Sequence, residues 1–328
     1  MQRRLTIFAL FALTVIILPL LVLHHLTIRA SAMDEKTTTP TTKEAQANKV
    51  LKDVGEAYMD QFGLTDADFK AMKKAGITII EGNFDICASD EDITYFLNKA
   101  KHYNMKVIMP AGSGEAEWGY TCDQESYPAT QKPVWQKTAV TQFINKWKSN
   151  TAIYAWDTSN EAGSVMPNAK KYMLTLPQLQ TAYKDVKKAD PTRPVMIRMN
   201  GWFFYDSATD FFKPGNPFGK DITDIVMVNA YSNVEDYYPD FVRTVMRRAQ
   251  TTITQIDPSV TYMAALGTWS EAPMWTLHTP ENLNHDIYAA KNGKQKAILA
   301  FFKYGAKGSE WYLPTDAPAL WKVITDTK

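Results

Sequence analysis

The sequence is poor in several residue types that mark common functional classes. It has two cysteines in 328 residues, too few for a fold built on disulfides. Its five histidines, at positions 24, 25, 102, 278 and 285, show no metal-ligand spacing. Lysine plus arginine (36) nearly balance aspartate plus glutamate (35), so the chain has no basic excess for nucleic acid. We therefore expect neither a metal centre nor a nucleic-acid partner.

Motifs for nucleotides and for acyl transfer are also missing. Residues 112–119, GSGEAEWG, are glycine-rich but match neither phosphate-loop pattern, and their carboxylates would repel phosphate. No Gly-x-Ser-x-Gly elbow occurs. No glycine-rich turn follows an early strand, which disfavours a doubly wound dinucleotide-binding sheet. We expect no cofactor.

The N-terminal region predicts export. An uncharged apolar run at residues 5–23 follows a short basic segment, and Ala30-Ser31-Ala32 resembles a signal-peptide cleavage site. The run is also long enough to span a bilayer, so an uncleaved membrane anchor is the alternative. Residues 1–32 are therefore a signal peptide or anchor, and the threonine-rich residues 33–48 a polar linker. We expect a secreted or otherwise extracytoplasmic protein, attached to the membrane if residues 5–23 are retained.

Residues 49–328 alternate strand and helix patterns, which predicts a (β/α)₈ TIM barrel of the α/β class. The expected strands are 50–59, 77–82, 106–112, 153–157, 194–200, 224–232, 261–269 and 306–313. The expected helices are 65–74, 89–104, 134–147, 176–189, 241–253, a stretch ending at 294–305, and 317–325. In this fold the functional site lies at the carboxyl ends of the strands.

The predicted strand ends carry carboxylates, amides and aromatic rings, with no histidine. Carboxylates and amides bind hydroxyl groups, and tryptophan and tyrosine rings stack on the apolar faces of sugars. The residues are Glu81, Asn83, Asp85, Glu115, Glu117, Trp118, Asp157, Asn160, Glu161, Asn200, Trp202, Asn229, Tyr231, Trp269, Glu271, Glu310, Trp311 and Tyr312. A neutral carbohydrate is the expected partner.

The stretch IYAWDTSNEA, residues 153–162, resembles the fourth strand of clan A glycoside hydrolases, which ends in Asn-Glu. VKKADPTRPVMI (186–197), DIVMVNAYS (224–232) and AFFKYGAKGSEWYL (300–313) resemble later parts of the same barrels. The resemblance implies that Glu161 is the general acid/base and that Asn160 contacts the sugar. It also implies that Tyr231 lies near the site, and we expect substrate contacts by Tyr231 and by Asn200 and Glu310 at their predicted strand ends. Trp118, Trp202, Trp269 and Trp311 would serve as sugar platforms.

The second catalytic carboxylate is less clearly placed. The resemblance puts it at the end of strand seven, where Gly267 and Thr268 stand, and Glu271 follows shortly after. Glu271 is therefore the expected nucleophile of a retaining enzyme, and Glu310 the reserve candidate. An inverting or transglycosylating enzyme that uses Glu81, Asp85 or Glu310 is another possibility. The arginine that several clan A families carry on strand two is replaced here by Glu81-Gly82-Asn83.

Together these features predict an exported, monomeric glycoside hydrolase acting on β-linked poly- or oligosaccharides. The alternative is a non-catalytic glycan-binding barrel at the cell surface that lacks the strand-seven nucleophile. Cys87 and Cys122 both follow neighbouring predicted strands, so a disulfide between them is expected in an oxidising compartment.

Overall fold

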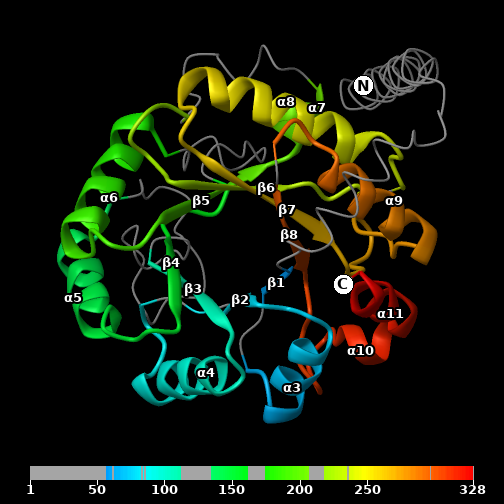
Figure 1. Ribbon diagram of the computed structural model, residues 1–328, viewed down its shortest axis with the longest axis horizontal. Coiled ribbons are helices and arrows are strands. Elements are labelled where there is room, and N and C mark those ends of the chain that lie inside the picture. The colour runs from blue at the N-terminus through cyan, green and yellow to red at the C-terminus, as the bar shows by residue number, and fades with distance from the viewer. Residues whose placement is uncertain are drawn as a thin grey trace, which may run out of the picture. The chain divides into compact units, whose positions relative to one another are not determined.

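The computed structural model describes most of the predicted barrel and none of the N-terminal region (Figure 1). The chain divides into two units, 1–45 and 46–328, and all described residues belong to the second. The described residues are 57–60, 63–82, 84, 86–111, 134–161, 174–206, 218–234, 236–295 and 297–327. Within these ranges no helix is long and apolar enough to cross a bilayer. The apolar run at 5–23 lies outside them.

Eight parallel strands pair in chain order and close into a barrel, because β1 pairs with both β2 and β8. The strands are β1 (Ala57–Asp60), β2 (Ile79–Glu81), β3 (Lys106–Pro110), β4 (Ile153–Asp157), β5 (Val195–Asn200), β6 (Ile225–Asn229), β7 (Thr261–Gly267) and β8 (Ala297–Phe302). The helices, labelled as in Figure 1, lie outside this ring of strands. They are α3 (Asp66–Lys74), α4 (Asp90–His102), α5 (Lys137–Trp147), α6 (Leu176–Ala189), α7 (Trp202–Asp206), α8 (Phe241–Ile256), α9 (Pro280–Lys291), α10 (Leu313–Asp316) and α11 (Pro318–Asp326).

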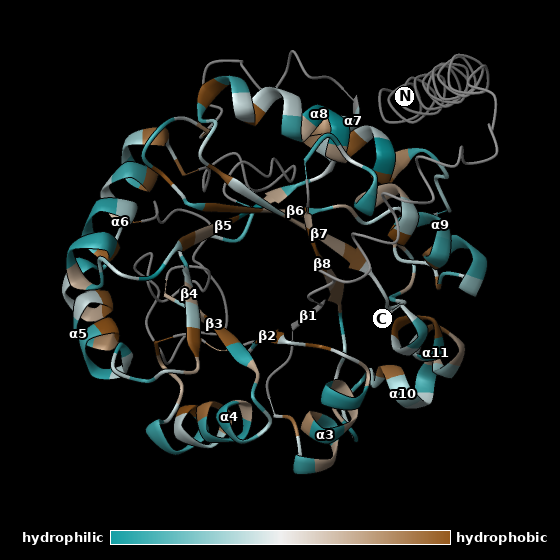
Figure 2. Cartoon of the chain, in the orientation of Figure 1, coloured by the Kyte–Doolittle hydropathy of each residue, from teal (hydrophilic) through white to brown (hydrophobic). Residues whose placement is uncertain are grey.

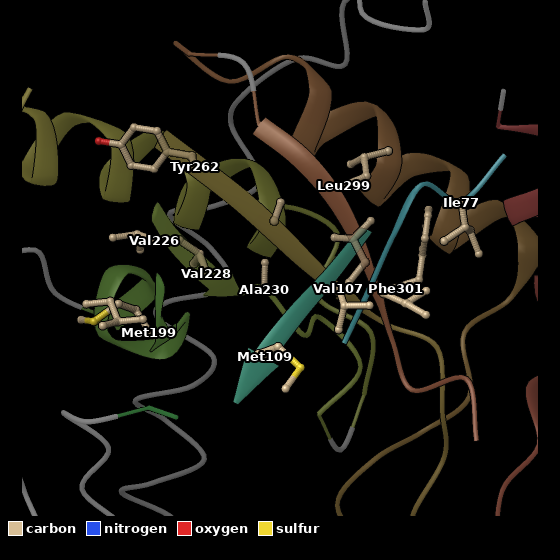
Figure 3. Packing of buried hydrophobic residues seen from close by; sticks show 14 of the residues in the cluster. Ile77, Val107, Met109, Met199, Val226, Val228, Ala230, Tyr262, Leu299 and Phe301 are labelled. Carbon is tan, nitrogen blue, oxygen red and sulfur yellow. The ribbon is translucent and has the colours of Figure 1, made fainter. Parts of the chain in front are cut away.

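The strands alternate between two apolar layers, as their period-two geometry requires. One set of side chains points outward against the helices; Figure 3 labels residues of this outer layer, of which Ile77 and Ala230 lie just outside β2 and β6. The other set fills the barrel interior: Ile79, Ile108, Ala155, Met196, Ile225, Met227, Met263, Ala265 and Ala300. Because both faces are covered, the strands are largely apolar along their length, whereas the helices mix hydrophobic and hydrophilic residues (Figure 2).

Local sequence signals fix several helix starts. Thr65 and Asp68 form a capping box at the start of α3. Asp68 is buried and also accepts hydrogen bonds from the hydroxyls of Tyr304 (3.1 Å) and Tyr312 (2.7 Å). This carboxylate therefore ties the first described helix to the segment that follows the last strand.

The Asp-Pro-x-Arg-Pro segment between α6 and β5 serves the structure of β4. Asp190 accepts hydrogen bonds from the indole of Trp156 (3.0 Å) and from Arg193 (2.6 Å). Arg193 also donates to the backbone carbonyls of Asn150 and Ile153. Burial opposes the ionised form of Asp190, but these bonds and those from Thr192 outweigh it and hold the pKa of Asp190 well below its usual value. The segment thus fixes the amino end of β4 against the turn before β5.

The predicted eighth strand was wrong. Residues 306–311 form turns after Gly305, whose φ is +79°, and β8 is Ala297–Phe302, which the sequence pattern had placed in a helix. A six-residue apolar run that is buried between two neighbouring strands has no diagnostic period, so it reads equally as a helix segment. The other seven predicted strands overlap observed ones.

Candidate active site

Glu161 follows β4 on a short extension that still pairs with β5. Thr158 N–H donates to the carbonyl of Met196, and Arg198 N–H donates to the carbonyl of Ser159 (both 2.9 Å). At Glu161 the chain turns sharply, with φ at +48°, a conformation few side-chain-bearing residues adopt. The extension and the turn therefore carry Glu161 to the carboxyl end of the barrel. Asn160, beside it, is exposed.

Two amide side chains hold the Glu161 carboxyl group. Asn200, at the end of β5, donates from Nδ2 to Oε2 at 3.1 Å. Asn229, at the end of β6, donates from Nδ2 to Oε1 at 2.7 Å. Three consecutive strands thus converge on one carboxyl group, which is half-buried.

A charged cluster lies in the barrel interior at the ends of β2, β4 and β5. Arg198 pairs with Glu81 and, through Nε at 2.9 Å, with Asp157. Both carboxyl groups are fully buried. Burial raises the pKa of Glu81 well above its ordinary value, Arg198 opposes this, and Asp157 adds to it. Burial also raises the pKa of Asp157, against Arg198 and a hydrogen bond from Glu81. Burial thus opposes ionisation of both carboxyl groups, more strongly at Glu81, while the guanidinium of Arg198 beside them favours it.

Aromatic rings gather at the ends of β6, β7 and β8. Tyr231 lies 4.9 Å from Trp269, 5.6 Å from Trp275 and 5.5 Å from Phe302 between ring centroids. Trp269 also packs on Trp275 (4.6 Å) and Phe302 (4.9 Å). Tyr231 and Trp269 are buried, and Trp275 and Phe302 are half-buried. This aromatic cluster joins two predicted site residues, Tyr231 and Trp269, with two that the sequence did not single out.

Of two other predicted sugar platforms, Trp202 has different neighbours, whereas Trp311 packs against the buried cluster that contains Tyr231 and Trp269. The ring of Trp202 packs among Tyr205, Tyr238 and Phe241, on the helix side of the barrel. The half-buried Trp311 donates from its indole N–H to the carbonyl of Lys303 at 3.1 Å. Trp118 lies outside the described residues.

The end of β7 carries no carboxylate. Gly267 is its last residue, and a Cβ atom there would lie 2.5 Å from Asn233 Oδ1 and 2.8 Å from the Trp269 ring. Thr268 is buried, and its hydroxyl donates to the carbonyl of Lys303. Glu271 comes four residues after the strand, exposed, in a hairpin closed by two backbone hydrogen bonds with Trp275 (3.0 and 2.7 Å). No hydrogen bond or ion pair between described residues joins Glu271 to Glu161.

Of the remaining predicted residues, the structure describes Glu310 and Cys87. Glu310 is exposed in the turn that replaces the predicted strand, eight residues after β8. Cys87 is in a disulfide, and Cys122, the only other cysteine in the sequence, lies outside the described residues. Asp85, Glu115 and Glu117 also lie outside them. Within the described residues no group of three metal-ligating side chains could hold a metal ion.

In the sequence, Asn229 is one polar strand end among many, and Arg198 is only an arginine inside a predicted strand. One signal was available for both. Side chains of a strand alternate between its two faces, and Met196 and Met227 point into the barrel. Arg198 and Asn200 on β5 and Asn229 on β6 therefore point inward as well. Which carboxyl group each would meet depends on strand register, which the sequence does not show.

Comparison with known proteins shows the fold. No family model and no curated protein matches the sequence. Among solved structures, a protein provisionally named an alpha-L-fucosidase from Bacteroides thetaiotaomicron has a TM-score of 0.61 at 12% identity, covering 90% of this chain and 97% of its own. The endo-beta-1,4-mannanase from Thermotoga petrophila has a TM-score of 0.56 at 11% identity, covering 83% and 75%. Fungal beta-1,4-galactanase has a TM-score of 0.51 at 11% identity, covering 75% and 88%. The chain therefore has the barrel fold that known glycoside hydrolases share.

Proposed function

We propose that this protein is an exported glycoside hydrolase that cleaves β-linked poly- or oligosaccharides, with Glu161 as the general acid/base. The observation that carries the proposal is the Glu161 carboxyl group, held at the mouth of the barrel by amides from two further strands. The fold supports it, since the sites of TIM-barrel enzymes lie at this end of the strands.

The chemistry needs a proton donor beside the glycosidic oxygen, which is a poor leaving group until protonated. Glu161 gives its proton to that oxygen as the bond to the anomeric carbon breaks. In a retaining reaction a second carboxylate attacks the anomeric carbon. Glu161, now ionised, then takes a proton from the water that releases the sugar. We assign the second role to Glu271, the carboxylate that follows β7 most closely.

The side chains at the carboxyl ends of the strands suit a neutral sugar. Trp275 and Phe302, the half-buried members of the aromatic cluster, offer aromatic surface of the kind that packs on pyranose rings, with the buried Tyr231 and Trp269 behind them. Exposed Asn160 offers both a hydrogen-bond donor and an acceptor to a sugar hydroxyl. Two of the structural neighbours are named for β-1,4-linked substrates, which favours a β-linked glycan here as well.

Export completes the proposal. The apolar run at 5–23 would direct the chain across a membrane, and the polar linker at 33–48 would separate it from the barrel. A disulfide at Cys87 fits an oxidising compartment. The chemistry assigned to Glu161 requires no cofactor, and we propose that the barrel acts as a monomer.

The test is hydrolysis of β-1,4-linked gluco-, manno- and galacto-oligosaccharides by the native chain and by Glu161→Gln. The variant keeps the shape of the side chain but has no proton to donate, so we expect hydrolysis to fall by about 100-fold or more. Asn160→Ala should instead weaken substrate binding. Equal rates for the native chain and Glu161→Gln would remove Glu161 from the mechanism.

A non-catalytic glycan-binding barrel is the second candidate, and one observation favours it. The last residue of β7 is Gly267, and Asn233 and Trp269 fill the space a side chain would need there. Binding of these oligosaccharides in calorimetry, without reducing ends appearing over days, would identify this function. Loss of hydrolysis in Glu271→Gln, with binding retained, would instead support the enzyme.

A further inference from the structure

The Glu161 carboxyl group is held firmly although its residue lies beyond the end of a strand. We propose that Asn200 and Asn229 are positioning residues that keep this group in its working orientation, and that Gly201 brings the two amides together. The inference rests on the proposed acid/base role of Glu161. It assigns Asn200 a partner in the protein instead of the sugar contact expected from the sequence.

Strand register places both amides at one level of the barrel. Asn200 and Asn229 are the last residues of β5 and β6 and are register partners. Both alternate with interior residues, Met196 on β5 and Met227 on β6, so both point inward. They reach different oxygen atoms of the same carboxyl group, at 3.1 and 2.7 Å. Two donors on two oxygens fix the rotation of the group as well as its place.

The amides are themselves held in place. The Asn200 oxygen Oδ1 accepts a hydrogen bond from the backbone N–H of Trp202 at 2.9 Å, which leaves the NH₂ end to face Glu161. The Trp202 ring is wedged against Tyr238 and Phe241, so this backbone N–H cannot move freely. Asn229 is only 4% exposed, and its Oδ1 is buried with no hydrogen-bond partner among the described residues. Burial and the bond to Glu161 therefore hold this amide, whereas Asn200 also has the bond from Trp202.

Gly201 allows the close approach of the two strand ends. Its N–H donates to the backbone carbonyl of Asn229 at 3.0 Å. A Cβ atom at position 201 would lie 2.5 Å from that same oxygen, closer than side-chain carbons come to backbone oxygen. Any other residue would push the end of β5 away from β6 and separate Asn200 from Asn229. In three consecutive residues, Asn200 thus donates to Glu161, Gly201 lets β5 end close to β6, and the backbone N–H of Trp202 holds the Asn200 amide.

A positioning role has a kinetic signature that a merely structural role lacks. Proton donation matters for a poor leaving group, whereas dinitrophenolate departs without a proton. Displacing a catalytic group by about 1 Å can cost about 100-fold in rate. Loss of an amide should therefore slow cleavage of a sugar–sugar bond and spare cleavage of a 2,4-dinitrophenyl glycoside of the same sugar.

The experiment compares kcat/KM for two substrates in the full chain. The first is whichever of cellotetraose, mannotetraose and β-1,4-galactotetraose the native protein cleaves, and the second is the matching 2,4-dinitrophenyl β-glycoside. For Asn229→Ala and Asn200→Ala we expect kcat/KM to fall about 100-fold on the tetraose and less than about 3-fold on the dinitrophenyl glycoside. KM for the tetraose should stay within about 2-fold, since neither amide is assigned to substrate binding. Gly201→Ala should show the same selective loss.

The controls separate folding from positioning. Asn292→Ala removes an amide that donates to a helix carbonyl at the end of α9, away from the strand ends, and should change neither rate. Asn229→Asp keeps the shape of the side chain and serves if the alanine variant does not fold. Equal losses on both substrates, or a change confined to KM, would overturn the positioning role and leave the proposed function standing. Absence of tetraose cleavage by the native protein would overturn both.

Discussion

Replacing Arg198 by methionine tests whether its guanidinium balances a negative charge on Asp157 in the buried cluster of Glu81, Asp157 and Arg198. Arg198 is the only positive charge among the contacts of Glu81 and Asp157 that the structure describes, and both carboxyl groups are fully buried. Burial raises the pKa of Glu81 well above its ordinary value, so we expect Asp157 to carry the negative charge that Arg198 balances. Methionine fills most of the arginine volume without the charge, which leaves Asp157 alone in an apolar interior.

The expected loss is large. Removing one partner of a buried ion pair costs about 3–5 kcal/mol. For a domain of this size, each kcal/mol shifts the melting temperature by about 2–4 °C, so a fall of at least about 6 °C is expected. The isolated Asp157 can escape its unpaired charge only by binding a proton. The deficit should therefore be smallest below the ordinary aspartate pKa of 3.8 and grow as the pH rises above it.

The assay is urea denaturation of the native protein and Arg198→Met at pH 5 and pH 8, followed by circular dichroism. Lys322→Met is the matched control, because it removes a positive charge from an exposed pair with Asp326 and should cost less than about 0.5 kcal/mol. A deficit below about 1 kcal/mol, or one that does not grow between pH 5 and pH 8, would refute the assignment of an unpaired charge to Asp157.

Three further predictions follow from single contacts. Glu81→Gln imitates the protonated side chain, so it should cost about 1 kcal/mol or less at pH 5. Native Glu81 should also lower the stability of the protein as the pH rises above 4.5, the ordinary pKa of glutamate, because its own pKa is raised. In Glu81→Gln the midpoint of urea denaturation should lack this part of the pH dependence. Asp190→Asn should cost about 1.5–3 kcal/mol at pH 7, since Asp190 accepts bonds from Arg193 and Trp156. The pKa of Asp190 is lowered, so its contribution is present above pH 3.8 and lost as the pH falls below it, and the two proteins should converge in acid. Asn233→Ala removes two bonds to backbone carbonyls, of Trp269 (3.1 Å) and Thr276 (2.8 Å), and should speed hydrogen exchange in residues 269–276 without changing that of β4.

The order of strands and helices was readable from the sequence because most elements carry their own signals. The strand at 153–157 and the helix at 176–189 were predicted with the observed bounds, the first from an apolar run and the second from its helical period. Residues 297–302 had no such signal, because a short run that is apolar at every position suits a buried strand and a buried helix equally. The barrel prediction held despite this error, since the number of strands and their alternation with helices were right.

The site was readable only in part, for a related reason. Asn160-Glu161 is a local motif, so the sequence could single it out. The amides at 200 and 229 are meaningful only as a pair across two strands, and the partners of Arg198 come from β2 and β4. Such contacts depend on the register of strands far apart in the chain, which a single sequence does not encode locally.

The two carboxylates of the proposed mechanism, Glu161 and Glu271, are held in place by different contacts. The less firmly held of the two, Glu271, therefore determines the distance between them. Glu161 is fixed by side chains from β5 and β6. Glu271 lies in a hairpin that is closed by its backbone hydrogen bonds with Trp275. The side-chain amide of Asn233 also holds this hairpin by donating to the backbone carbonyls of Trp269 and Thr276. Retaining chemistry needs the second carboxylate about 5 Å from the first, and inverting chemistry about 6.5–9.5 Å. Because β7 itself ends in glycine, the position of this hairpin sets that separation, and the stereochemistry of the product reports it directly.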